Sequence, residues 1–166
     1  LCDQLAEKLP DGRYPIDLGD RKGWPASQVF EDIMLGTDPQ IYQDFINGIY
    51  NVEDVTKVLS TYAKLMDYVA PDHSSRDWYE ASGQVVAGTY AMQIMGAWMQ
   101  PLMTSMGQEY GKDYGIFTFP GTEGWFGMCI DGLVVSNDSA DVEAGVRWAY
   151  NVSTQEVQTS FSALKE

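Results

Sequence analysis

Apolar residues recur at helical spacing through the first half of the chain. Residues 52–69 carry valine, leucine, tyrosine and methionine at steps of three and four, the pattern of an amphipathic helix. Asn51 and Asp54 stand at its start as a capping pair, because side-chain oxygens there accept hydrogen bonds from free backbone N–H groups. The pattern therefore predicts a helix that begins just after Asn51.

Proline, glycine and capping residues divide the remainder of this half into shorter helices. Pro25 stands at a favoured first helical position and Gly36 at a position where helices tend to end. Asp38 is the expected N-cap of the next helix, and Ser74 that of a helix that ends at Gly88. The sequence predicts several short helices joined by tight turns.

The hydrophobic period then changes. Tyr90 to Met95 is almost continuously apolar, which is typical of a strand buried on both faces. Residues 113–121 and 124–136 indicate two further strands, and residues 139–161 return to helix, with Ser153 as a cap. Helices that alternate with short buried strands predict a layered α/β architecture.

Composition limits the classes of function. The 166 residues, 45% of them hydrophobic, can bury a core of about one ordinary domain. A net charge of −14 argues against nucleic-acid, anionic-lipid and polyphosphate partners, which need clustered Lys and Arg. The chain begins without Met inside a helical pattern, has no apolar run of membrane-spanning length and no signal-peptide pattern. We expect a fragment of a longer protein.

The sequence contains no pattern typical of a metal site or a redox site. Cys2 and Cys129 match no metal spacing, and nothing in the sequence brings them together as a disulfide. His73 is the single histidine, which excludes a multi-histidine metal site in this chain. Turn and cap residues surround it, so an exposed loop histidine is expected. The sequence predicts neither a metal nor a cofactor.

Four segments in a fixed order resemble a known family. They are RDWYEASGQVVAGTYAMQIMGAW, DYGIFTFPG, DGLVVS and NVSTQEVQTSF. In this order they resemble the extracytoplasmic sugar-binding proteins of ABC transporters, such as the maltose-binding and bacterial glucose-binding proteins, from about Trp24 onward. The resemblance implies an α/β fold of the type II periplasmic-binding-protein kind, with two lobes joined by hinge strands. It also implies a receptor rather than an enzyme, monomeric at full length, periplasmic or lipid-anchored, that delivers sugar to an ABC permease in the membrane.

The same resemblance divides the chain. Residues 1–113 correspond to most of the C-terminal lobe, 114–138 to a hinge strand and a returning strand, and 139–166 to helices that pack on a largely absent N-terminal lobe. We therefore expect apolar side chains after Pro120, including Trp125, Val134, Val135 and Trp148, to be exposed or to be covered by self-association.

Two tryptophans are the main candidates for ligand contact. A hexose carries C–H groups on its faces and hydroxyls at its edge, so its site needs flat aromatic faces and polar groups at the rim. Trp98 follows the apolar segment, and Gly96 separates the two. The resemblance implies that Trp98 stacks on the sugar and that Trp78 lies in the same cleft. Simple core packing remains the alternative for both rings.

Four further residues are weaker candidates. Asp131 precedes Gly132 at the end of a predicted strand, where a carboxylate accepts hydroxyl hydrogen bonds and the backbone approaches a ligand. A solvated turn aspartate is the alternative. Asp20 and Trp24 stand just before a predicted helix, in a segment that reaches the cleft in the resembled family.

Two other classes of function stay open. A carbohydrate-active enzyme also combines tryptophan with acidic residues, but it needs two carboxyl groups about 5 to 10 Å apart. A protein-interaction module would suit the methionine and tryptophan content. The identity of the sugar does not follow from the sequence, because an aromatic platform accepts the face of any pyranose.

Overall fold

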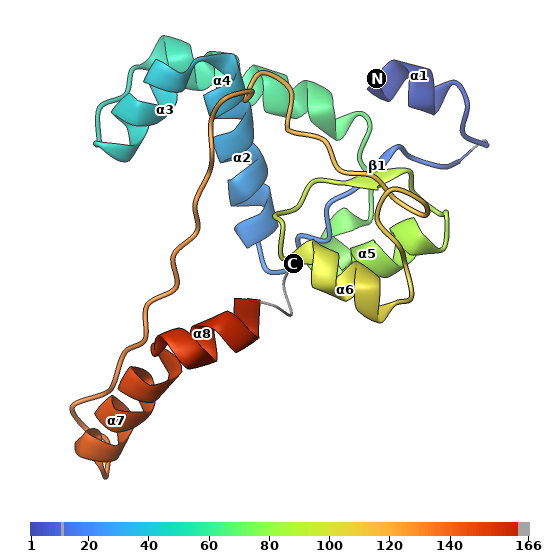
Figure 1. Cartoon of the computed structure of the whole chain (residues 1–166). Helices are drawn as coiled ribbons and strands as arrows, with labels where there is room; N and C mark the ends of the chain where they lie inside the picture. The colour runs from blue at the N-terminus through green and yellow to red at the C-terminus, as the bar shows by residue number, and fades with distance from the viewer. Residues whose placement is uncertain (11, 163–166) are drawn as a thin grey trace. The chain divides into compact units, whose positions relative to one another are not determined.

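The computed structural model describes residues 1–10 and 12–162. The described residues form two compact units, which divide after Trp125. Figure 1 shows the elements of each unit. The larger unit contains α1 (Cys2–Ala6), β1 (Ile16–Asp17), α2 (Trp24–Thr37), α3 (Pro39–Ile46), α4 (Val52–Met66), a 3-10 turn (His73–Ser75), α5 (Trp78–Val86), β2 (Met92–Gln93) and α6 (Met99–Ser105). The smaller unit contains α7 (Val142–Val152) and α8 (Gln155–Ser162). None of these helices is long and apolar enough to span a membrane.

Side-chain caps begin two of the helices as the sequence predicts. The Asp38 carboxylate accepts a hydrogen bond from the N–H of Gln40 at 2.8 Å, and Asn51 accepts one from the N–H of Asp54 at 2.9 Å. The prediction that Ser74 caps the next helix is wrong. Asp77 and Glu80 form the capping box of α5, so the helix begins at Trp78 and Ser74 lies in the 3-10 turn.

Gly36 does not end α2, which continues to Thr37. A Cβ at this position would lie 2.5 Å from the carbonyl oxygen of Pro120. The glycine therefore allows the loop at Pro120 to pack closely against α2. The helix ends where Asp38 turns to an extended conformation before Pro39.

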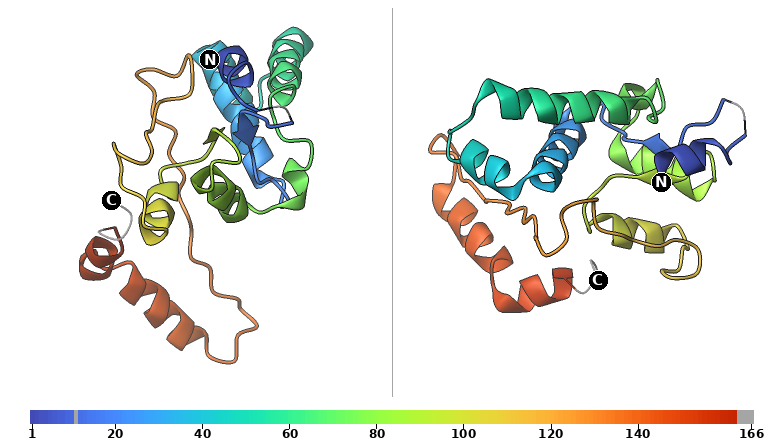
Figure 2. Two further views of the ribbon diagram at one scale, coloured as in Figure 1. Left: turned by 90° about the vertical axis from the view of Figure 1, so that its right-hand side faces the viewer. Right: turned by 90° about the horizontal axis from the view of Figure 1, so that it is seen from above.

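The hydrophobic core gathers around β1, which the sequence pattern did not predict. β1 pairs in parallel with β2, and Ile16 also bridges to Val69. The buried members come from β1, α2, α4 and the segments beside them: Ile16, Leu18, Val29, Ile33, Met34, Val58 and Val69. The helix α2 packs against both α3 and α4 (Figure 2). β1 thus pairs with β2 and also packs against the helices α2 and α4 through the core.

A charged group lies within this core. The Asp17 side chain is fully buried and accepts a hydrogen bond from Nε of Arg76 at 2.8 Å. Arg76 also donates to the carboxylate of Asp72 at 2.6 Å and lies over the ring of Tyr90, 5.5 Å from its centroid. The guanidinium therefore holds together β1, the 3-10 turn and the segment before β2.

The two later strands predicted at 113–121 and 124–136 are wrong within the described residues. The backbone there is irregular, apart from an isolated bridge between Tyr110 and Tyr114. A strand needs a neighbour to satisfy its N–H and C=O groups, and beyond that single bridge no described segment forms a ladder with these residues. The predicted strand at Tyr90–Met95 is reduced to β2. The described fold is therefore helix-rich with a small parallel sheet.

Apolar side chains after Pro120 are exposed, as expected from the sequence. Val134 is 95% exposed, Trp148 61% and Trp125 49%. Val135 is an exception, because it is half-buried against Gly145 of α7. A Cβ at Gly145 would lie 2.7 Å from Cγ1 of Val135. Cys2 and Cys129 are both free thiols. Residues 163–166, the end of the segment 139–166 that was predicted to pack on an N-terminal lobe, lie outside the described residues.

Burial makes one carboxyl group of α2 sensitive to pH. Desolvation, reinforced by the neighbouring negative charge of Glu31, raises the pKa of Asp32 from its ordinary value of 3.8 to about 6. The folded protein therefore binds more protons than the unfolded chain between pH 4 and 6. Its stability falls as the pH rises through this window.

We expect Asp32→Asn to raise the free energy of unfolding at pH 7 by about 1 kcal/mol, a value reduced for the partial exposure of the side chain. At pH 4 most of the gain should disappear, because Asp32 is then protonated in the folded protein and about half protonated in the unfolded chain. Urea unfolding at pH 7 and at pH 4 measures the difference. Glu123→Gln, in an exposed turn of the same unit and away from any helix end, is the control and should change neither value. A gain of equal size at both pH values would contradict the assignment.

Candidate ligand-binding site

Two tryptophans far apart in the sequence meet in the larger unit. Trp24 is the first residue of α2, and Trp98 is the N-cap residue of α6. Their ring centroids lie 6.1 Å apart with an interplanar angle of 57°. Trp24 is 37% exposed and Trp98 is half-buried, so both residues of the pair are partly exposed. Such a tilted aromatic pair can receive an apolar molecular face.

Gly96 sets the position of the Trp98 ring. A Cβ at residue 96 would lie 2.4 Å from Cη2 and Cζ3 of that indole. Any side chain at this position would displace the ring. The apolar pattern indicates Gly96 only as a break after the run, and its place two residues before Trp98 is the signal that points to this contact.

The carboxylate of Asp20 is held by His73. Nδ1 of His73 and Oδ1 of Asp20 are 2.5 Å apart, and the Asp20 side chain is only 9% exposed. The carbonyl of His73 also accepts a hydrogen bond from the Asp20 N–H at 3.3 Å. The prediction of an exposed loop histidine was wrong, because the ring is 20% exposed and engaged by this carboxylate. One Asp20 oxygen is thus committed within the protein.

The loop that carries Asp20 and Trp24 is fixed against the start of α5. A Cβ at Gly19 would lie 2.7 Å from Cα of Trp78, and the backbone φ of Gly19 is +62°. The Arg21 guanidinium forms an ion pair with the Asp77 carboxylate, which is buried at the N-cap of α5. These contacts hold the residues that precede Trp24 in one conformation.

Trp78 lies beside this loop through its backbone. Its half-buried ring packs edge-on against Tyr79, with centroids 6.2 Å apart and an interplanar angle of 89°. Its carbonyl accepts hydrogen bonds from Ser82 and Gln93 at 2.9 Å. The Trp78 backbone therefore lies against the loop that carries Asp20 and Trp24. The Trp78 ring contacts the Tyr79 ring.

Asp131 and Gly132 lie in the smaller unit, so the structure groups them separately from the tryptophan pair. Both are exposed, and a Cβ at Gly132 would meet open space. Across residues 1–10 and 12–162, no group of His, Cys, Asp or Glu side chains is arranged to hold a metal ion. The larger unit thus presents an aromatic site with a nearby engaged carboxylate.

Several known proteins are similar in sequence to this chain. A family model described as bacterial extracellular solute-binding protein matches residues 2–159. An uncharacterized ABC transporter extracellular-binding protein of Pyrococcus horikoshii is 36% identical over 97% of this chain and 37% of its own length. A probable sugar-binding periplasmic protein of Mesorhizobium japonicum is 30% identical over 68% of this chain and 28% of its own length. One of Brucella suis is 26% identical over 93% of this chain and 38% of its own length.

Proposed function

The chain belongs to the bacterial extracellular solute-binding proteins, and from this premise we propose that it forms part of a saccharide receptor that serves an ABC transporter. The observation that carries the proposal is the Trp24–Trp98 pair, with ring centroids 6.1 Å apart and both residues partly exposed. The relatives named as sugar-binding periplasmic proteins support a saccharide rather than another solute.

The chemistry of the pair suits a pyranose. The C–H groups of a sugar face pack favourably on an indole ring, while the hydroxyls at the edge need polar partners. Trp98, seated on Gly96, serves as the main platform in our proposal, and Trp24 flanks it. Asp20 supplies an acceptor through the carboxylate oxygen that His73 does not hold. Trp78, Asp131 and Gly132 complete the proposed set of ligand-binding residues.

The chain spans 28 to 38% of the length of the three relatives described above. We propose that residues 1–113 form most of the C-terminal lobe and that 139–166 pack on an N-terminal lobe. Residues 114–138, irregular in this structure, would supply hinge and returning strands once a sheet of the N-terminal lobe pairs with them. In this arrangement the saccharide lies between two lobes, outside the cytoplasm, and passes to a membrane permease. Unpaired backbone and exposed apolar side chains at 126–134 favour an additional sheet as their partner.

A carbohydrate-active enzyme is the competing function. It needs two carboxyl groups about 5 to 10 Å apart across a scissile bond, and the carboxylate nearest to the tryptophans in sequence, Asp20, is engaged by His73. Incubation of the full-length protein with oligosaccharides distinguishes the two functions. Saturable binding without product supports the receptor, and turnover supports the enzyme.

A thermal-shift screen of the full-length protein against simple sugars tests the proposal. A ligand at about 100 times its dissociation constant adds about 2.7 kcal/mol of stability, which raises the unfolding temperature by several degrees. The proposal expects this response from one class of sugar. Lack of a response from every pentose, hexose and disaccharide would count against a saccharide ligand.

The role of Asp131 is a separate prediction. Asp131→Asn keeps the shape of the side chain and removes its charge, and a charged acceptor binds a hydroxyl more strongly than a neutral one by about 1 kcal/mol. We expect the affinity of the full-length protein for its sugar to fall about fivefold. Calorimetry measures the change, with Asp138→Asn, an exposed turn residue nearby, as the control. An unchanged affinity would show that Asp131 is a solvated turn residue that does not contact the sugar.

A further inference from the structure

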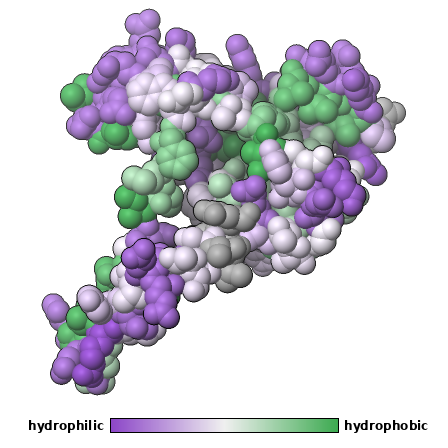
Figure 3. Space-filling model, viewed as in Figure 1, coloured by the Kyte–Doolittle hydropathy of each residue, from purple (hydrophilic) through white to green (hydrophobic). Residues whose placement is uncertain are grey.

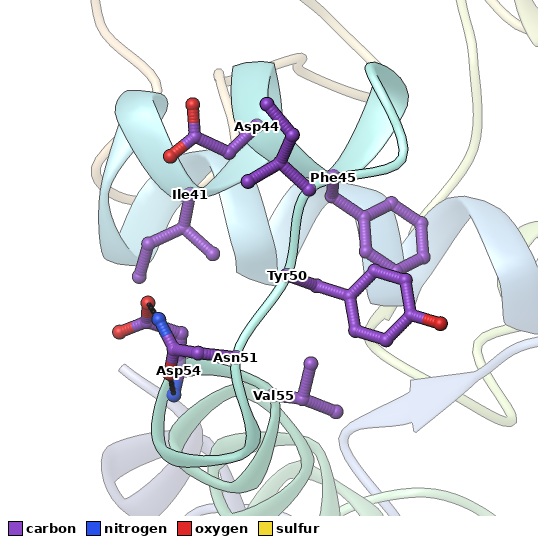
Figure 4. Close-up of a pocket in the computed structure, with 8 residues that line it drawn as sticks. Ile41, Asp44, Phe45, Tyr50, Asn51, Asp54 and Val55 are labelled. Atoms are coloured by element: carbon purple, nitrogen blue, oxygen red, sulfur yellow. Dashed lines mark hydrogen bonds between the residues drawn. The ribbon is translucent and has the colours of Figure 1, made fainter.

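A small apolar pocket lies away from the tryptophan site, between α3 and the start of α4 (Figure 4). Ile41 and Phe45 of α3 form one wall, Val55 of α4 the other, and Ile49 and Tyr50 lie in the connecting segment. Its volume of about 110 Å³ is somewhat below the ~150 Å³ of an apolar cavity that accommodates benzene. The space therefore suits one branched aliphatic side chain.

The pocket belongs to a wider exposed apolar patch. Ile49 is 62% exposed and Tyr50 is 72% exposed, and the neighbouring Ile46 and Val52 are 56% and 83% exposed. Figure 3 shows hydrophobic surface at this end of α3, beside hydrophilic surface. The Phe45 ring is held between Phe30 and Tyr50, with centroids 5.9 and 6.2 Å away. Contiguous exposed apolar surface with ordered aromatic walls is typical of a protein contact.

Two carboxylates give the opening a negative charge. Asp44 lies on α3 and Asp54 on α4, on opposite walls of the pocket (Figure 4). Asp44 accepts a hydrogen bond from Nε2 of Gln40 at 2.7 Å, and Asp54 accepts one from the side-chain amide of Asn51. Both partners are neutral, and in the described part of the chain neither carboxylate forms an ion pair. A cation beside the pocket would thus meet two carboxylates that have no cationic side-chain partner in the described residues.

From this charge complementarity we propose that the pocket docks a basic segment of a partner protein, which inserts a leucine or isoleucine side chain between flanking Lys or Arg residues. The aliphatic side chain contacts Ile41, Ile49 and Val55. The flanking cations pair with Asp44 and Asp54, which fixes the direction of the segment and disfavours acidic partners. This surface is independent of saccharide binding at the tryptophans.

Methyl NMR of the full-length protein tests the proposal with three synthetic peptides. The probe is acetyl-Lys-Leu-Lys-amide, and the controls are acetyl-Lys-Ser-Lys-amide and acetyl-Glu-Leu-Glu-amide. We expect the probe to shift the methyl signals of Ile41, Ile49 and Val55 saturably. Both controls should bind at least about tenfold more weakly, since one lacks the apolar side chain and the other reverses the charge.

Variants test each part of the pocket. Ile49→Ser should abolish the response, whereas Ile46→Ser, which removes an equally exposed isoleucine outside the pocket lining, should preserve it. Asp44→Asn should weaken binding about two- to fivefold, and Asp67→Asn should not. Equal binding of the acidic peptide, or no shift with the probe, would overturn the proposal. Protection of these methyl groups from a soluble paramagnetic agent before peptide is added would also overturn it, because the rest of the protein or a second copy would then fill the pocket.

Discussion

Replacement of Arg76 by alanine is expected to lower the free energy of unfolding of the larger unit by about 3 to 5 kcal/mol. Its Nε donates to Asp17, whose side chain is fully buried beside β1. The variant would leave a carboxylate in the core without its cation, and one Asp17 oxygen already lacks a hydrogen-bond partner in the structure. Urea unfolding followed by tryptophan fluorescence measures the loss.

Two further variants separate the buried charge from the surface ion pair. Asp72, the other carboxylate partner of Arg76, has a side chain that is 59% exposed. Asp72→Ala should therefore lower the free energy of unfolding by less than about 1 kcal/mol. Replacement of Asp17 and Arg76 together by leucine should recover much of the stability lost in the single variant, because no uncompensated charge remains. Equal losses for Arg76→Ala and Asp72→Ala would contradict the burial of the Asp17–Arg76 pair.

Trp98→Ala is expected to weaken saccharide binding by the full-length protein by about 1 to 3 kcal/mol, or about five- to 150-fold, while the fold survives. The indole is the proposed platform, and alanine removes the surface on which the sugar face packs. Gly96→Ala should weaken binding in the same direction, since its Cβ would lie 2.4 Å from the ring and force it to move. Calorimetry of both variants measures the loss.

The matched control for the platform is Tyr50→Ala. Tyr50 is an aromatic residue, 72% exposed, in the segment between α3 and α4. Its replacement should leave the affinity for sugar unchanged. If Trp98→Ala binds normally, or unfolds while Tyr50→Ala remains folded, Trp98 acts only in packing and the stacking proposal fails.

The sequence predicts the local features of this fold better than the long-range ones. Asp38 and Asn51 act as caps because a cap depends on a few consecutive residues. The two residues of β1 are too few for an alternating pattern. The strands expected at 113–121 and 124–136 do not form, because a strand depends on a partner elsewhere in the protein.

The same distinction applies to the site. Asp20, Trp24 and Trp98 were candidates from the sequence, and the structure places the two rings in contact. The pairing of Asp20 with His73 was not predicted, since no local pattern indicates a contact across 53 positions. Asp17 and Arg76 were missed for the same reason.

Calorimetric titration of the full-length protein with pentoses, hexoses and disaccharides tests the central proposal most directly. A saccharide receptor predicts saturable heat from one class of sugar, with one site, a dissociation constant near micromolar, equivalent to about −8 kcal/mol, and unchanged sugar recovered afterwards. Absence of saturable heat from every sugar, or conversion of the titrated sugar to product, would contradict it.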